Sequence, residues 1–440
     1  MFNMKNVIGA LLALLLVATG LAAQVGLLPV TGGDRSPLVP GTPTPSGALR
    51  AQPAPIQAAT ATPEPTPEPT TVPAPQPRRE TRALWVSRWD LKDHPDVRAI
   101  VDRAAEANMN VILFQVRGQA DALYPSSIEP WAADMTGNLG QDPGRDVLAE
   151  LVQLAHARGI EVHAWVNVYP AWMGKTAPAA TVTPKPMYHD FNARYGAEWL
   201  QWKDGQPMRL GDGDGYLWAN PAHPAVSDRV VAVCKDLLER YELDGLHLDY
   251  IRYAGPEYST DPVSNQAYAE AAARQPGLSR ADWQRAQVTA LVTRVRDEAL
   301  PVRPNARLTT TAWPVYQDRW GWYKGKDGYG AFYQDSQAWA RDGVVSGIMP
   351  MLYGMTLNDY PDRFQTLARD YVDGSRPGAV ITGIGTDYAD FTAIADRIDV
   401  ARQAGAQGQA LFSFRALEEH GHWAALRAGP YAEPAVPSWR

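Results

Sequence analysis

The chain has 440 residues, of which 45% are hydrophobic and 20% charged, and its formal net charge is -7. This is the composition of a soluble protein with enough apolar residues for a core of a few hundred residues. A mildly acidic balance with no long run of lysine or arginine argues against nucleic acid as a partner.

The chain begins with the pattern of an export signal. A single lysine precedes an almost unbroken apolar run over residues 7–23 that ends in small side chains. This pattern predicts a signal peptide over residues 1–23, cleaved after Ala22 or Ala23. The apolar character continues weakly to Val30, so an uncleaved membrane anchor is the alternative. In both cases we expect the body of the protein to be extracytoplasmic, either secreted or anchored to the outer face of the cytoplasmic membrane.

Residues 24–78 are rich in proline, threonine and alanine, with the run PEPTPEPTTVPAPQP at residues 63–77. Such a segment cannot bury a core, so it is predicted to be a disordered, extended linker. All 15 tryptophans lie at Trp85 or later. We therefore expect one folded domain over residues 79–430, followed by a tail at 431–440.

From residue 79 the chain repeats an apolar run, a polar loop and an amphipathic helix. Strands alternating with helices imply a parallel sheet, and eight units favour a (β/α)8 TIM-type barrel with long loops at its C-terminal face. The competing open, doubly wound sheet would more often show a glycine-rich turn after the first strand, which residues 87–95 lack. The predicted strands are 83–89, 110–118, 161–169, 245–253, 307–315, 346–354, 379–388 and 409–415.

The residues at the ends of these strands are the candidates for the active site of a barrel. Asp249 and His247 share one face of the fourth predicted strand, and Gln115 and Arg117 are predicted to share a face of the second. Packing in the barrel interior explains any single histidine or tryptophan equally well, and Asp249 alone could cap a turn. The further candidates at strand ends are His163, Trp165, Asn167, Arg252, Trp313, Tyr353, Asp387, Phe414 and Arg415.

Aromatic residues are concentrated in two of the predicted loops. Residues 170–223 contain four tryptophans, and the loop after the fifth strand adds Trp320 and Trp322. Rings at the rim of a polar cleft suit sugar binding, because the apolar face of a pyranose stacks on them. The alternative is that the rings attach the long loops to the barrel.

Metal and cofactor chemistry have no support in the motifs. The first strand lacks the histidine pair of metal-dependent amidohydrolases, and HExxH and GxSxG are missing. No cofactor and no metal site are therefore predicted. The single cysteine, Cys234, lies on the apolar side of a predicted helix and is expected in the core.

Several long motifs resemble the glycosyl-hydrolase-like family 10, which comprises bacterial exported barrels related to glycoside hydrolases. The resemblance covers residues 80 to about 415. Its motifs are ETRALWVS at 80–87, NVILFQVRGQADALYPSSIEPW at 110–131, HARGIEVHAWVNVY at 156–169, NPAHPAV at 220–226, YELDGLHLDYIRY at 241–253 and YQDSQAWARDGVVSGIMPMLYG at 333–354.

The resemblance implies a TIM-type barrel that acts on extracytoplasmic glycans, with bacterial cell-wall polysaccharide as the substrate class. It implies that Asp249 is the functional carboxylate of the fourth strand. The chain departs from the family at Tyr250, where a second acidic residue is frequent, and at Val168, where a proline is frequent. The sugar-contacting set that the resemblance implies is Gln115, Arg117, His163, Trp165, Asn167, His247 and Tyr353.

Glycoside hydrolysis generally needs two carboxyl groups that flank the bond. Asp249 is the predicted first member, with His247 and Arg252 as neighbours that hold or tune it. Asp387 is the predicted partner because it follows the seventh strand, with Asp318 and Glu257 as further candidates. Asp335 begins a predicted helix, so it is also explained as a cap. The alternative function is a glycan-binding barrel without turnover, which the lack of any glutamate at a strand end favours.

Overall fold

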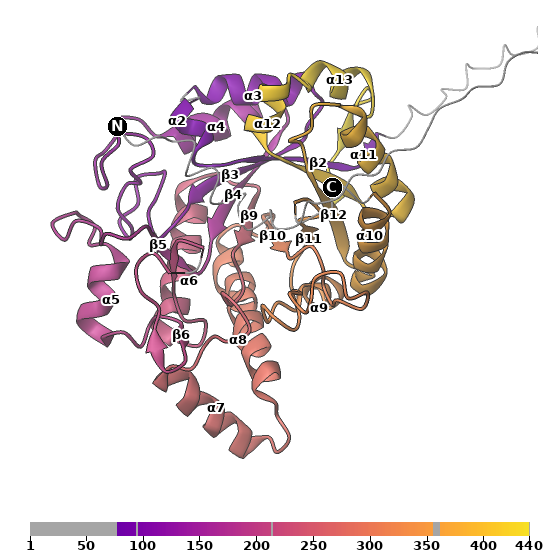
Figure 1. Ribbon diagram of the computed structural model, residues 1–440. Coiled ribbons are helices and arrows are strands. Elements are labelled where there is room, and N and C mark those ends of the chain that lie inside the picture. Colours follow the sequence, from indigo (N-terminus) through magenta and orange to yellow (C-terminus); the bar gives the residue numbers. More distant parts are fainter. Residues whose placement is uncertain (1–76, 94–95, 213, 355–360, 440) are drawn as a thin grey trace, which may run out of the picture. The chain divides into compact units, whose positions relative to one another are not determined.

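The computed structural model describes residues 77–93, 96–212, 214–354 and 361–439. The predicted leader, and all but the last two residues of the predicted linker, lie outside the described residues. Eight parallel strands close into a barrel in which β13 pairs with β2 (Figure 1). In order around the barrel these are β2 (Thr81–Val86), β3 (Val111–Arg117), β4 (Glu161–Asn167), β9 (Gly245–Asp249), β10 (Arg307–Ala312), β11 (Gly347–Pro350), β12 (Ala379–Gly385) and β13 (Gly408–Phe412).

The predicted (β/α)8 barrel is confirmed, and all eight predicted strands are present. Their carboxyl ends come one to four residues earlier than predicted. The fourth strand shows why: β9 ends at Asp249, and Tyr250 has a φ of 50°, which is incompatible with a β-strand. Ile251 and Tyr253 are fully buried all the same. The strands were therefore predicted too long, because buried apolar residues of the loops that follow them extend the apolar stretches of the sequence.

Helices surround the barrel in Figure 1, and their apolar faces pack on the outside of the strands. In α3, for example, Val97, Ile100 and Val101 are buried at helical spacing, and the Asp96 carboxylate caps the amino terminus. The helices around the barrel are α2 (Asp90–Asp93), α3 (Val97–Glu106), α4 (Val147–His156), α6 (Pro224–Arg240), α8 (Arg280–Arg294), α9 (Ser336–Arg341), α10 (Pro361–Ser375), α11 (Thr392–Ala404), α12 (Phe414–His420) and α13 (Trp423–Ala428).

Two long connections add structure beyond the regular barrel. The loop after β4 contains α5 (Met187–Tyr195), and the loop after β9 leads into α7 (Pro262–Arg274). Within the described residues, no helix combines the length and apolar character that a membrane crossing requires. The β4 loop also holds two small antiparallel sheets, β5 (Pro170–Met173) with β8 (Tyr216–Trp218), and β6 (Trp202–Lys203) with β7 (Gln206–Pro207).

Of the residues predicted as a tail, those that the structure describes, 431–439, pack against the amino-terminal end of the barrel. In this segment β14 (Ala435–Val436) pairs in parallel with β1 (Arg78–Arg79). The indole N–H of Trp439 donates to Glu161 Oε2 at 2.9 Å, and its ring lies 5.6 Å from the ring of His163 inside the barrel. The C-terminal segment thus covers the end of the barrel opposite the strand ends where catalytic groups are expected.

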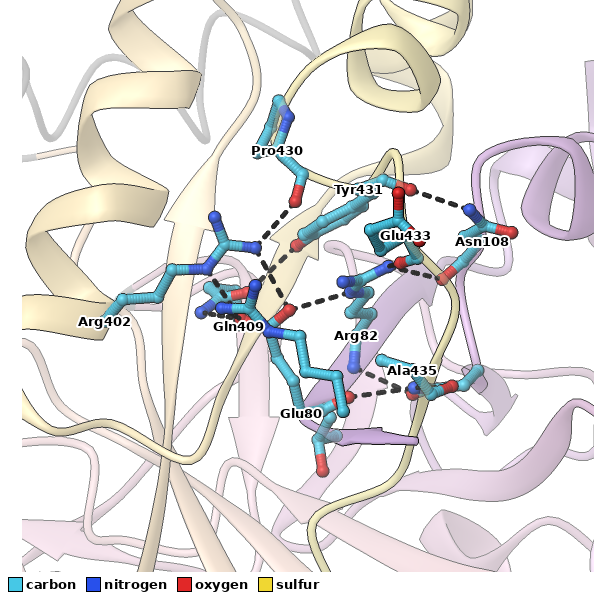
Figure 2. Close-up of polar contacts among 12 residues, drawn as sticks. Glu80, Arg82, Asn108, Arg402, Gln409, Pro430, Tyr431, Glu433 and Ala435 are labelled. Carbon is cyan, nitrogen blue, oxygen red and sulfur yellow. Dashed lines mark hydrogen bonds and ion pairs between the residues drawn. The ribbon is translucent and has the colours of Figure 1, made fainter. Parts of the chain in front are cut away.

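Glu80 lies at the centre of the polar contacts that hold this segment (Figure 2). Its carboxylate accepts from Arg82 Nε at 2.9 Å and from Arg402 Nε at 2.7 Å. The same two arginines donate to the carbonyls of Glu433 and Pro430. Burial alone would raise the pKa of Glu80, but the hydrogen bonds and charges of Arg402 and Arg82 outweigh it and hold this pKa below its usual value.

Candidate active site

Asp249, the last residue of β9, is held in one orientation by groups from its own loop and from β10. Its Oδ1 accepts from the Thr311 hydroxyl and from the Tyr250 backbone N–H, both at 2.6 Å. Arg252 Nη1 lies 3.7 Å from the same oxygen. The other oxygen, Oδ2, makes no hydrogen bond with any residue that the structure describes. The three groups stabilise negative charge on Asp249 and leave one oxygen available.

Arg252 lies among three aromatic rings at the mouth of the barrel. The guanidinium carbon is 4.4 Å from the centre of the Tyr250 ring, 5.2 Å from that of Trp313 and 5.7 Å from that of Trp218. Cation–π attraction stabilises a guanidinium in such a position. Arg252 and Trp313, both predicted as substrate-binding residues, are therefore neighbours beside Asp249.

Aromatic rings also form the layer inside the barrel next to the mouth. Tyr353 and Phe412 stack with parallel planes, 5.1 Å between ring centres, and Trp85 meets both rings edge-on at 6.2 and 6.0 Å. Burial and the negative charge of Asp249 raise the pKa of the Tyr353 phenol well above its usual range. Tyr353, which was predicted to contact sugar, therefore lies close to Asp249 and remains neutral.

The contact of His247 with substrate stays a prediction, and the structure places this side chain inside the barrel. His247 is fully buried, and its Nε2 accepts from the indole N–H of Trp85 at 3.1 Å. Its Nδ1 is 2.9 Å from the Thr309 hydroxyl, so both ring nitrogens have partners inside the barrel. Burial, with a smaller effect of His163, lowers the pKa of His247 well below its usual value. His247 is a neutral residue that positions Trp85.

His163 lies one layer deeper in the barrel and is not at the mouth either. It is fully buried, adjacent to Trp439, and its Nε2 is 3.4 Å from Glu161. Alternation along β4 correctly puts His163 on the same face as Trp165 and Asn167. Two residues of a strand span about 6.6 Å, however, and this rise takes His163 away from the strand end. The sugar contact of His163 likewise stays a prediction.

Arg117 does not share a face with Gln115, because a β-bulge separates them. Gln115 pairs with Trp165, whereas Arg117 pairs with Val166, which packs outside the barrel. The guanidinium is fully buried and donates to both oxygens of Glu129, at 2.7 and 2.8 Å. Arg117 is therefore the buried ion-pair partner of Glu129 in the loop after β3, and its sugar contact stays a prediction.

The remaining predicted polar residues at the mouth are bonded mainly to the protein. Gln115 Oε1 accepts from the backbone N–H of Arg88 at 3.0 Å. Asn167 Oδ1 accepts from the indole N–H of Trp165 at 3.0 Å, and its amide donates to the Gly118 carbonyl. The side chains of Gln115, Trp165 and Asn167 are nearly fully buried. These three side chains therefore form part of the wall of the barrel mouth.

The sequence reasoning missed Arg88 and Asp121. Arg88 directly follows the first strand region and is fully buried, 3.7 Å from Asp121 and 3.8 Å from Asp134. Its Nη2 is 3.5 Å from the Tyr216 hydroxyl, and the Tyr216 ring lies 5.5 Å from that of Tyr250. The signal was present, because Arg88 is a charged residue at a strand end. Asp121 is a second buried carboxylate in the loop after β3.

The carboxylates proposed from sequence as partners of Asp249 have other contacts. The Asp387 side chain is 72% exposed and lies 3.0 Å from His420 Nε2. Asp318 accepts from backbone N–H groups of its own loop, and Glu257 pairs with Lys203 at 2.8 Å. Asp335 accepts from the Tyr316 hydroxyl at 2.6 Å. No hydrogen bond or ion pair joins any of the four to Asp249 in the described part of the chain.

Among the described residues, no group of three or more histidine, cysteine, aspartate or glutamate side chains could hold a metal ion. Cys234 is buried in α6 and contributes to the core there, as predicted.

Two curated relatives match more than half of this chain. Glycosyl hydrolase YngK of Bacillus subtilis (strain 168) is 26% identical over 297 residues, which cover 62% of this chain and 54% of that protein. Glycosyl hydrolase DigH of Escherichia coli (strain K12) is 28% identical over 295 residues, which cover 66% of this chain and 64% of that protein. The chain thus spans between about half and two thirds of the length of these curated relatives.

Solved structures with the same fold are more distant in sequence. The glycoside hydrolase domain of PgaB (BpsB) from Bordetella bronchiseptica superposes with a TM-score of 0.54 at 13% identity, covering 79% of this chain and 98% of that domain. The catalytic domain of β-amylase from Paenibacillus polymyxa gives a TM-score of 0.52 at 9% identity, covering 80% and 99%. These likenesses show the barrel fold alone. The family model described as Glycosyl hydrolase-like 10 matches residues 80–396, which is more than half of the chain, and the chain therefore belongs to this family.

Proposed function

We propose that this protein is an extracytoplasmic glycoside hydrolase that cleaves O-glycosidic bonds of a polysaccharide, with bacterial cell-wall glycan as its substrate class. The observation that carries the proposal is Asp249: a buried carboxylate at a strand end, with one oxygen held by two donors and the other without a hydrogen bond to any described residue. Aromatic rings beside it suit the apolar faces of sugars. The predicted leader supports the location, and the family supports the reaction.

The contacts of Asp249 favour a role as the ionised member of the carboxyl pair. Thr311, Tyr250 and Arg252 all direct positive or partly positive groups at Oδ1. Such groups stabilise a carboxylate, which serves as nucleophile or as base toward water, over a carboxylic acid. Asp387 remains the proposed proton donor from its position after the seventh strand. Asp121 is the second candidate because it is buried near the same mouth.

The test is the release of reducing ends from a panel of glycans that includes peptide-free peptidoglycan strands. We expect release by the parent protein and a loss of about a thousandfold or more in Asp249→Asn, roughly 4 kcal/mol of transition-state stabilisation. Asp204→Asn is the matched control, because Asp204 is exposed in the β6–β7 turn and has a φ of 51°, which asparagine tolerates. Equal activity of Asp249→Asn and the parent would refute the assignment of Asp249.

One observation favours the alternative, a glycan-binding barrel without turnover. The predicted partner Asp387 is 72% exposed and lies 3.0 Å from His420 Nε2, and the amides of Gln115 and Asn167 are engaged within the protein. Under this alternative the parent and Asp249→Asn would both bind a glycan of the panel, and neither would release reducing ends.

A further inference from the structure

Arg252 is a buried cation whose guanidinium makes no hydrogen bond within the described part of the chain. Its side chain is 9% exposed, and its Nη1 is fully enclosed without a hydrogen-bond partner. No hydrogen bond joins the guanidinium to any residue that the structure describes, although the group carries five N–H donors. The Asp249 carboxylate, at 3.7 Å, is its ion-pair partner but lies beyond hydrogen-bonding distance.

A guanidinium that is buried without hydrogen bonds lowers the free energy of unfolding. Burying a charge without hydrogen bonds forfeits its hydration, and the rings of Tyr250, Trp313 and Trp218 attract the charge but provide no oxygen acceptor. The fold satisfies buried arginines elsewhere: Arg117, buried to the same degree or more, places two donors on Glu129. The described residues therefore leave the N–H donors of Arg252 without an oxygen acceptor.

A second guanidinium at the same mouth also has buried N–H donors without hydrogen-bond partners. Arg88 Nε and Nη1 are buried without hydrogen-bond partners, and its nearest carboxylates lie 3.7 and 3.8 Å away. Tyr216 and Tyr250 connect the two arginines, because Arg88 contacts Tyr216 and Arg252 contacts Tyr250. The unused N–H donors of the two guanidiniums favour a ligand that offers strong hydrogen-bond acceptors.

We propose that Arg252 binds a carboxylate carried by the substrate sugar, so that this mouth selects acidic glycans. The proposal rests on the proposed function, because it places the sugar beside Asp249. A carboxylate offers two oxygens in the geometry of the guanidinium fork, whereas a sugar hydroxyl offers one weaker bond. The carboxylate could be that of a uronic acid or of an ether-linked lactyl group, and both present the same chemistry to Arg252.

The test compares binding of matched oligosaccharides by calorimetry, in an Asp249→Asn background that prevents turnover. The acidic ligands are a uronic-acid oligosaccharide and a peptide-free peptidoglycan oligosaccharide, each beside its carboxyl-reduced form. We expect Arg252→Met to weaken binding of the acidic form about 30-fold and that of the reduced form by less than about threefold. Arg252→Lys, which keeps the charge but loses the fork, should fall between the two.

The matched control is Arg209→Met, which removes the same charge from an exposed position in the loop after β4. It should leave both affinities unchanged, and thermal melting should confirm that every variant is folded. The acidic ligand that shows the difference identifies the source of the carboxylate. The proposal would be overturned if Arg252→Met weakened binding of the acidic and reduced forms equally. It would also be overturned if the protein with Arg252 intact bound neither acidic ligand, or preferred neither over its reduced form. Selective binding in this background, together with no release of reducing ends by the parent protein, would retain the proposal and refute hydrolysis.

Discussion

At the scale of single residues, Thr311 orients the carboxylate that we propose as catalytic. Its hydroxyl donates to Asp249 Oδ1 at 2.6 Å across neighbouring strands, in a position closed to water. The adjacent Thr310 provides a contrast, because its hydroxyl is buried without a hydrogen-bond partner. Two neighbouring threonines thus differ in the single contact that concerns the site.

We expect Thr311→Val to lower kcat about tenfold to a hundredfold, because a hydrogen bond to a charged group is worth about 1.5–3 kcal/mol. The measurement is reducing-end release under saturating glycan. Thr310→Val is the control: it replaces an unpaired buried hydroxyl with a methyl group of similar shape, so activity should be unchanged and stability equal or higher. A loss of activity in Thr310→Val equal to that in Thr311→Val would show that the effect is packing of β10 rather than orientation of Asp249.

At the scale of elements, the carboxylate of Glu80 joins segments from both ends of the domain. It follows β1, and the arginines that it binds come from β2 and α11 and reach the C-terminal segment through backbone carbonyls (Figure 2). A buried carboxylate between two guanidiniums is costly to remove, since both cations would lose their partner.

We expect Glu80→Gln to lower the free energy of unfolding by about 3 kcal/mol, measured by urea denaturation at pH 7. The pKa of Glu80 is depressed in the folded protein, so its contribution is fully present above its usual value of 4.5 and is lost as the pH falls through the lower folded value. The parent should therefore lose more stability below that pH than the variant. Glu242→Gln, at an exposed position before β9, should match the parent. Parallel pH profiles for the parent and Glu80→Gln would contradict the role of this ion pair.

At the scale of the whole barrel, one end is covered by the C-terminal segment and the other carries the candidate active site. The C-terminal segment covers one end, where Trp439 contacts His163 and Glu161. Asp249, Arg252 and the aromatic rings lie at the other end, where strands of a parallel barrel present their functional groups. Stability and chemistry should therefore respond to different substitutions.

We expect Trp439→Ala to destabilise the protein by about 3 kcal/mol, because it removes a large aromatic ring from the end of the barrel. Trp439→Phe, which keeps a ring but loses the N–H donor to Glu161, should cost about 1 kcal/mol. Below the melting temperature both variants should keep the parent's kcat, measured on the same glycan. A fall in kcat without a fall in melting temperature would show that this end of the barrel influences the chemistry.

The sequence by itself determined the eight strands, the barrel and the position of Asp249 at a strand end. These features depend on alternation, helical spacing and local chain order, all of which are local properties. The tertiary structure alone decided the depth of His163 and His247, the outward turn of Arg117 and the contacts of Arg88 with Asp121. It also brought Trp439 and Glu80 to the closed end. Those outcomes depend on register, on a bulge and on pairs of residues far apart in the chain, and no local pattern encodes them.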